Sequence, residues 1–248
     1  MKKHLSVLIV TARESIWWVS IIWLISAVLQ TIFFYNEMNS EHVTETRLVS
    51  EAFNPYTDRI TVPVIFAFTF LITGIILMKT GMEFHTKTGY TLRRLRITEK
   101  QVYIIQSVYN CIIIFILFLF ETAFCFFLIS QGVKHIDPQY ITPQMIYLTF
   151  YRTGFLQNVF AGRNILKILR NILIILSLGF NISAFSYLWR RGVKYIFGII
   201  LLVTCSFLYW WSPDYGGYAE DISFLITALG MLLTAAGIIR TRRKEYDA

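Results

Sequence analysis

Residues 101–120 read QVYIIQSVYNCIIIFILFLF and contain no charged side chain. The run does not alternate in polarity, and it is longer than a strand of a membrane barrel. An α-helix rises ~1.5 Å per residue, so roughly 20 residues cross the ~30 Å hydrocarbon core of a bilayer. Lipid offers the backbone no hydrogen-bond partners, so a membrane-spanning segment must be a helix or a strand of a closed barrel. With a barrel strand excluded, a helix remains for this run. The stretch therefore predicts a transmembrane helix, which we extend past Glu121 to residue 131.

Five other uncharged apolar runs are long enough to cross a bilayer as helices. Of the 248 residues, 56% are hydrophobic and 15% are charged, a composition typical of membrane proteins. We therefore predict an all-α membrane protein in which residues 1–248 form a single transmembrane domain. Its six transmembrane helices are expected at about 15–35, 60–78, 101–131, 168–189, 195–213 and 222–239.

The N-terminus resembles a short signal peptide, because two lysines precede an apolar stretch. No convincing small-residue cleavage site follows, and Arg13 and Glu14 interrupt the stretch, so we expect it to be retained. Residues 5–16 are expected to form a short amphipathic helix at the cytoplasmic surface, before the first span, where lysine and arginine meet lipid headgroups.

Basic residues predict the orientation of the chain. With both termini in the cytoplasm, sixteen of the 23 lysines and arginines lie on the cytoplasmic side and seven lie outside, as the positive-inside rule requires. The formal net charge of +8 is therefore interpreted as a topology signal, and no nucleic-acid partner is expected. Residues 132–170 are expected to form an outer connection with an interfacial or partly inserted helix. A re-entrant hairpin remains an alternative.

The residues that hydrolytic enzymes usually need are missing from the sequence. It has no phosphate-binding loop, no H-E-x-x-H and no G-x-S-x-G motif, and its four histidines are scattered over different loops. The three cysteines lie inside apolar runs without metal-ligand spacing. We therefore expect no catalytic residues, no metal site and no cofactor bound by this chain.

The most informative polar segment is the cytoplasmic loop 80–100, which contains GYTLRRLRITEK at residues 89–100. A short helix can follow Gly89. Thr98 can then cap a new helix that becomes the third span, with Gln101 completing a capping-box pattern. The loop is therefore expected to present a short helix to the cytoplasm.

This loop resembles that of the membrane subunits of type-2 ABC exporters, in which a glycine and a short helix with two leucines precede a Ser/Thr restart into a long third span. In that family the short helix is a coupling helix that sits in a groove of the ATPase subunit. The resemblance implies that the ATPase is contacted by Glu83, His85, Tyr90, Arg93 and Arg94, and that a second coupling loop contains Arg190, Arg191 and Lys194. Alternatively, these basic residues anchor the loops to anionic lipid.

The resemblance further implies a permease that exports its substrate across a bacterial plasma membrane. Two permease copies would join two ATPase chains, which would bind the ATP and Mg. A hydrophobic or amphipathic substrate such as a peptide, toxin or drug fits the aromatic content of 17%. The alternative is a non-transport membrane sensor or assembly protein that binds a cytoplasmic partner through loop 80–100.

Two further features concern the outer half of the membrane. Glu121 interrupts the third span, and an acid there should not face lipid. It is a candidate pathway residue, or else it bonds to a neighbouring helix, with Lys167 or Arg170 as plausible partners. Arg163, Lys167 and Arg170 are spaced for one helical face at the outer mouth, where they anchor to headgroups or form a basic vestibule.

Overall fold

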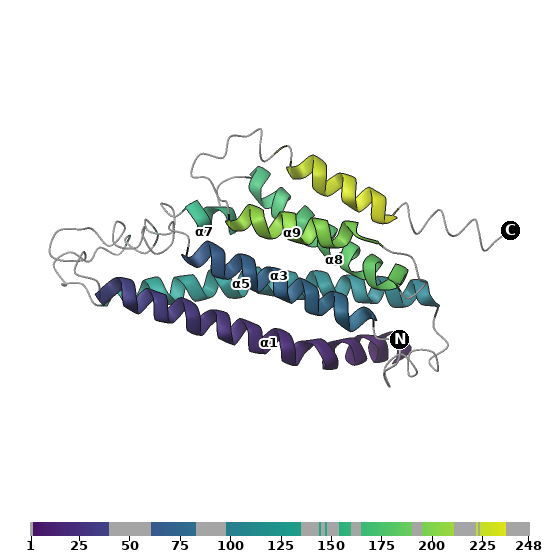
Figure 1. The fold of residues 1–248 in the computed structure, drawn as a ribbon, viewed down its shortest axis with the longest axis horizontal. Helices are drawn as coiled ribbons and strands as arrows, with labels where there is room; N and C mark the ends of the chain where they lie inside the picture. Colours follow the sequence, from purple (N-terminus) through teal and green to yellow (C-terminus); the bar gives the residue numbers. More distant parts are fainter. Residues whose placement is uncertain are drawn as a thin grey trace.

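The chain is a bundle of α-helices in a computed structural model (Figure 1). The structure describes residues 2–39, 61–82, 98–134, 144, 147, 154–159, 165–189, 195–210, 222 and 224–236. This described part contains no β-strand, which agrees with the predicted all-α class. Its helices are α1 (Lys2–Asn39), α3 (Thr61–Met82), α5 (Glu99–Val133), α7 (Gly154–Val159), α8 (Ile165–Trp189), α9 (Phe197–Trp210) and the unlabelled helix Phe224–Ala236.

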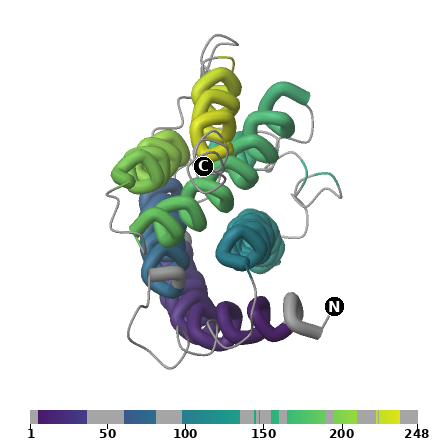
Figure 2. Tube along the Cα trace, turned by 90° about the vertical axis from the view of Figure 1, so that its right-hand side faces the viewer, coloured from purple at the N-terminus to yellow at the C-terminus, as the bar shows by residue number. Residues whose placement is uncertain are grey.

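The long helices lie side by side and alternate in direction along the chain (Figures 1 and 2). Helix α1 packs on α3 and α5, and these two helices pack in turn on α8. Helix α9 packs on α3 and α8. Helices α1 and α5 consequently run parallel to each other, a relation that the candidate site depends on.

Four helices are long and apolar enough to cross a membrane: Ser6–Asn36, Thr61–Thr80, Glu99–Val133 and Ile165–Trp189. Two shorter apolar helices, Phe197–Tyr209 and Phe224–Ala236, fall within the last two predicted spans. Those predicted spans continue into residues outside the described part. The chain thus has the helices of a multi-pass membrane protein, with four candidate spans.

The N-terminus differs from the expected arrangement. Instead of a separate surface helix over residues 5–16, α1 is one helix of 38 residues that takes in both this segment and the first predicted span. The physical reason is local: residues 2–39 include neither glycine nor proline, the residues that most readily end a helix.

Helix α5 begins where the sequence predicts but without the predicted side-chain cap. Thr98 has the extended backbone of an N-cap, and its carbonyl oxygen accepts hydrogen bonds from the backbone amides of Gln101 and Val102. Its side chain makes no capping hydrogen bond. The helix therefore starts without a side-chain cap from Thr98 and continues for 35 residues.

Helix α1 exposes many large apolar side chains and buries several polar ones, the opposite of a helix on the surface of a water-soluble protein. Trp17 is 72% exposed and Leu24 is 64% exposed, whereas Ser15, Ser26 and Gln30 are buried. Lipid offers polar side chains no hydrogen-bond partners, so in a membrane helix they tend to face other helices, while apolar side chains can face the lipid. This pattern supports a membrane location for α1.

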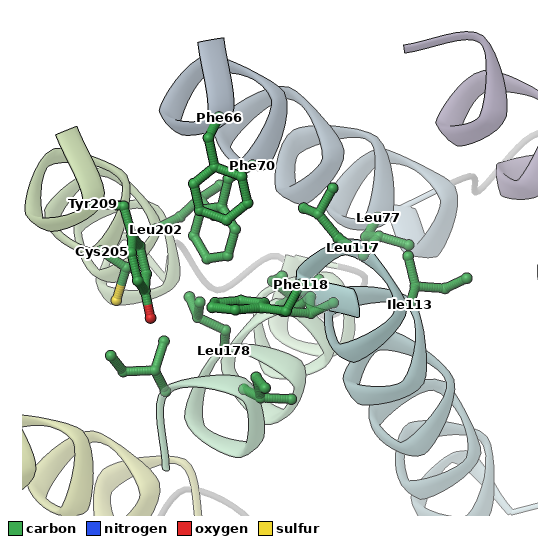
Figure 3. Close-up of a cluster of buried hydrophobic side chains, with 14 of the residues drawn as sticks. Phe66, Phe70, Leu77, Ile113, Leu117, Phe118, Leu178, Leu202, Cys205 and Tyr209 are labelled. Carbon is green, nitrogen blue, oxygen red and sulfur yellow. The ribbon is translucent and has the colours of Figure 1, made fainter. Parts of the chain in front are cut away.

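Aromatic rings, most of them from other helices, surround Phe66 of α3, and Figure 3 shows Phe70, Phe118 and Tyr209 among them. The ring centroid of Phe66 lies 5.6 Å from Phe118 of α5, 5.6 Å from Phe155 of α7 and 5.5 Å from Tyr209 of α9, in edge-to-face geometry. Phe70 extends the cluster along α3, 6.0 Å from Phe118. Edge-to-face contacts add attraction beyond apolar burial, so this cluster fixes the relative positions of the four helices.

Small residues bring α5 and α8 into close contact. A Cβ atom added to Gly179 of α8 would lie 2.9 Å from the backbone nitrogen of Cys111 and 3.1 Å from the carbonyl oxygen of Ser107. Beside it, the amide of Asn110 donates a 3.0 Å hydrogen bond to the hydroxyl of Ser183. Close backbone approach combined with interhelical polar contacts is characteristic of membrane helix packing.

Candidate functional site

The buried face of α1 makes hydrogen bonds to its two neighbours at three levels. Near its start, the hydroxyls of Ser15 and Tyr109 lie 2.6 Å apart, linking α1 to α5. Midway, the indole nitrogen of Trp23 donates to the hydroxyl of Thr73 on α3 over 3.4 Å. Further along α1, Gln30 bonds to Glu121 of α5. The first and last of these bonds hold the parallel helices α1 and α5 in register.

We call the contact of Ser15 and Gln30 of α1 with Tyr109 and Glu121 of α5 the α1–α5 seam. Glu121 is its buried acid, with an exposed fraction of 0%. The side-chain amide nitrogen of Gln30 donates a 2.6 Å hydrogen bond to its Oε1 atom. Its Oε2 atom has no hydrogen-bond partner among the residues that the structure describes. The partner on the neighbouring helix is therefore a neutral amide of α1, where the sequence suggested Lys167 or Arg170.

Aromatic side chains form a ladder beside Glu121. Trp23 of α1 stacks on Phe120 with ring centroids 5.5 Å apart, Phe120 stacks on Phe124 at 5.9 Å, and Phe124 stacks on Phe127 at 6.2 Å. The three phenylalanines are spaced by four and three residues, which places them on one face of α5. Phe127 is 53% exposed, so the ladder extends from the α1–α5 seam to the surface of the chain.

A second buried polar cluster caps the end of α7. Asn171 of α8 donates through its Nδ2 atom to the carbonyl oxygens of Asn158, at 2.8 Å, and Val159, at 3.0 Å. Arg170 donates to the same Asn158 oxygen at 3.1 Å, and Tyr209 donates to Oδ1 of Asn171 at 2.9 Å. The last carbonyls of a helix lack partners within it and carry partial negative charge, so an amide and a guanidinium are suited to this position.

Helix α7 itself lies against the bundle. Its Phe155, Leu156 and Val159 side chains are buried in the hydrophobic core. This short helix belongs to the segment 132–170, for which the sequence predicted an outer connection with an interfacial or partly inserted helix. Most of the rest of that segment lies outside the described residues.

A third polar contact connects α8 with the segments that follow it. The hydroxyl of Tyr195 donates to Oδ1 of Asn181 over 2.5 Å. The Nδ2 atom of Asn181 donates to the carbonyl oxygen of Ser177 at 2.8 Å and to that of Met231 at 3.4 Å. Asn181 therefore links α8 to the start of α9 and to the last described helix.

The predicted outer-mouth residues have different environments. Lys167 is half-buried on α8, and Arg170 is 4% exposed because its guanidinium bonds at the end of α7. Arg170 is thus a residue of the α7 cap. Outside the described residues lie Arg163, both predicted coupling sets (Glu83, His85, Tyr90, Arg93 and Arg94, and Arg190, Arg191 and Lys194) and the predicted coupling helix.

Gln30 is the residue of this site that the sequence reading missed. A signal was present, because Ser15, Ser26 and Gln30 recur at helical spacing within an otherwise apolar span. Such a polar stripe in a membrane helix faces other helices. The pattern alone indicates the face of α1 but not which residue of which helix it meets.

The described residues contain no group of three His, Cys, Asp or Glu side chains that could hold a metal ion. Their chemistry consists of one buried carboxyl with a neutral partner, an aromatic ladder and hydrogen-bonded contacts between helices. In comparisons with known proteins, no family model, no curated protein and no solved structure matches this chain. The fold therefore defines its class, an α-helical protein of multi-pass membrane type.

Proposed function

We propose that the chain is the permease subunit of an ATP-driven ABC exporter of the bacterial plasma membrane. It crosses the membrane six times with both termini in the cytoplasm, and it forms the translocation pathway as a dimer. Its substrate is hydrophobic or amphipathic, such as a peptide, a toxin or a drug. ATP hydrolysis takes place on two separate ATPase chains.

The observation that carries this proposal is the continuity of α5. The helix begins at Glu99, directly after the basic loop that resembles a coupling element, and reaches Glu121 without a break. These two residues lie about 33 Å apart along the helix axis at 1.5 Å per residue. A rigid helix of this kind transmits a displacement of the loop to the buried carboxyl. Helix α3 ends at Met82 on the other side of the same loop, so both helices that flank it would move with the ATPase.

The packing of α5 supports a mechanism of alternating access. Helix α5 contacts α1 at the Gln30–Glu121 seam and α8 at the Gly179 contact. When ATP closes the ATPase dimer, movement of loop 80–100 shifts α5 against these two neighbours and opens the membrane dimer outward. Glu121 then serves as a pathway residue at the contact between α1 and α5, which rearranges when α5 shifts.

The test is co-purification of the chain with a candidate ATPase subunit, sought among the neighbouring genes, followed by ATPase measurements in lipid nanodiscs. We expect a stable complex whose ATPase activity falls when Tyr90 or Arg93 is replaced by alanine. The matched control is Lys134→Ala, which removes an exposed basic residue just beyond the opposite end of α5.

Failure of the wild-type chain to bind any ATPase would overturn the proposal. Binding of a cytoplasmic protein without ATPase activity through loop 80–100 would favour the sensor or assembly function instead. Equal losses of activity in the loop variants and in Lys134→Ala would contradict the coupling role of the loop.

A further inference from the structure

The seam between α1 and α5 combines two chemical features that no motif of the sequence reveals. One is a fully buried carboxyl group whose Oε2 atom has no hydrogen-bond partner in the described part of the chain. The other is the aromatic ladder formed by Trp23, Phe120, Phe124 and Phe127. Both occur on the same stretch of α5, because Glu121 follows Phe120 directly and precedes Phe124 by one turn.

A carboxyl group is costly to keep in a membrane interior unless its environment satisfies it. The Gln30 amide provides one neutral donor, to Oε1. The described residues provide no second donor for Oε2. A positively charged group on a ligand would provide the missing interaction. Interactions of a carboxylate with a charged group are stronger than those with a neutral one.

The aromatic ladder favours a ligand whose remaining groups are apolar. The faces of aromatic rings attract cations and also bury apolar surface. The exposed fraction of Phe127, 53%, places one end of the ladder at the outer surface of the chain, while Trp23 and Phe120 continue it into the seam. A ligand dissolved in the membrane can thus follow one continuous aromatic surface from lipid to the neighbourhood of Glu121.

We propose that the α1–α5 seam at Glu121 is a binding site for lipophilic organic cations. The carboxyl group of Glu121 pairs with the positive charge, and the ladder holds the apolar groups. This inference rests on the proposed export function for its biological meaning, since it narrows the substrate class to amphipathic compounds that carry a positive charge. The binding itself requires only this chain.

The probe is tetraphenylphosphonium, and triphenylphosphine oxide is a neutral analogue that keeps three of its four phenyl groups. Binding of each is measured by equilibrium dialysis against the full-length chain in nanodiscs, without the ATPase. Glu121→Gln keeps the size of the side chain and an acceptor for Gln30 but removes the charge. We expect it to weaken phosphonium binding by roughly tenfold or more, the scale of a hydrogen bond or contact to a charged group, and to leave binding of the neutral analogue unchanged.

Two further variants separate the contributions. Phe124→Leu removes the ring that stacks between Phe120 and Phe127 and is expected to weaken binding of both probes. Thr122→Val is the matched control, because Thr122 is buried beside Glu121 and its hydroxyl bonds to the carbonyl oxygen of Phe118 in its own helix. It should bind both probes as the wild type does.

Unchanged phosphonium affinity in Glu121→Gln overturns the inference, as does an equal loss for the neutral analogue. If Glu121→Gln does not fold, the wild-type protein decides: tetraphenylphosphonium should protect Glu121 from modification by dicyclohexylcarbodiimide, and lack of protection overturns the site. The two proposals fail separately, since a chain that binds the phosphonium but no ATPase refutes only the exporter function.

Discussion

Gln30 of α1 donates a 2.6 Å hydrogen bond to Glu121 of α5, and the two residues are 91 positions apart in the chain. The bond joins two parallel helices at their buried faces, and the Ser15–Tyr109 contact holds the same pair nearer their start. Two hydrogen bonds at different points along the helices fix how far α1 is shifted relative to α5, because sliding one helix along the other breaks both bonds.

Gln30→Leu should destabilise the fold by about 1–3 kcal/mol, because it leaves a buried carboxyl without its donor. Glu121→Leu should likewise remove the 2.6 Å acceptor of the Gln30 amide, which keeps its 3.5 Å contact to the hydroxyl of Ser26. The double variant should be more stable than the sum of the two losses predicts, since two apolar partners leave no unsatisfied group. The stabilities of the wild type, the two single variants and the double variant form a double-mutant cycle. They are measured by thermal unfolding in detergent, followed by tryptophan fluorescence. Strictly additive losses would show that the bond contributes no coupling.

Gly179→Ala should destabilise the bundle by about 1–3 kcal/mol through overpacking. The added methyl group meets the backbone of Cys111 and Ser107, which cannot move aside as a side chain can. Gly230→Ala is the matched control, because a Cβ atom there meets nothing within 4 Å. The midpoint of thermal unfolding distinguishes the two, and equal midpoints would contradict the close contact between α5 and α8.

Asn171→Ala should release α7 from the bundle. The substitution removes the donor to Asn158 and Val159 and the acceptor for Tyr209 in one step. We expect faster hydrogen exchange at the backbone amides of Gly154–Val159, measured by mass spectrometry. Ser183→Ala, which breaks a polar contact elsewhere on α8, should leave exchange in this segment unchanged. The capping role is refuted by wild-type exchange rates in Asn171→Ala.

Cysteines introduced at His85 and at Glu45 should react from opposite sides of the membrane. The excess of basic residues in loop 80–100 predicts that position 85 is cytoplasmic and position 45 is outside. Labelling with a membrane-impermeant maleimide in intact and in permeabilised cells measures both positions. Labelling of both from the same side would contradict the proposed topology.

The helices of this protein follow from runs of apolar residues that sequence reading recognises directly. Residues 5–16 were predicted to form a helix before the first span, and the structure has them in one continuous helix with that span, because neither glycine nor proline interrupts residues 2–39. The cap of α5 was correct in position but not in chemistry, since Thr98 contributes its backbone and not its side chain.

The contacts between helices were harder to predict from the sequence than the helices themselves. The sequence indicated that Glu121 should turn away from lipid but suggested cationic partners. In the structure Arg170 bonds at the end of α7, and Gln30 bonds to Glu121. Periodicity indicates which face of a helix is buried, but the partner depends on the rotation and height of the neighbouring helix.

The sequence by itself determined that the chain is helical and suited to a membrane, because hydrocarbon permits only internally bonded backbone and tolerates few charges. Only the tertiary structure decided that α1 and α5 meet at Gln30 and Glu121, that an aromatic ladder runs beside them, and that Asn171 caps α7. These features join residues far apart in the chain, and their positions depend on side-chain packing at each crossing rather than on any local pattern.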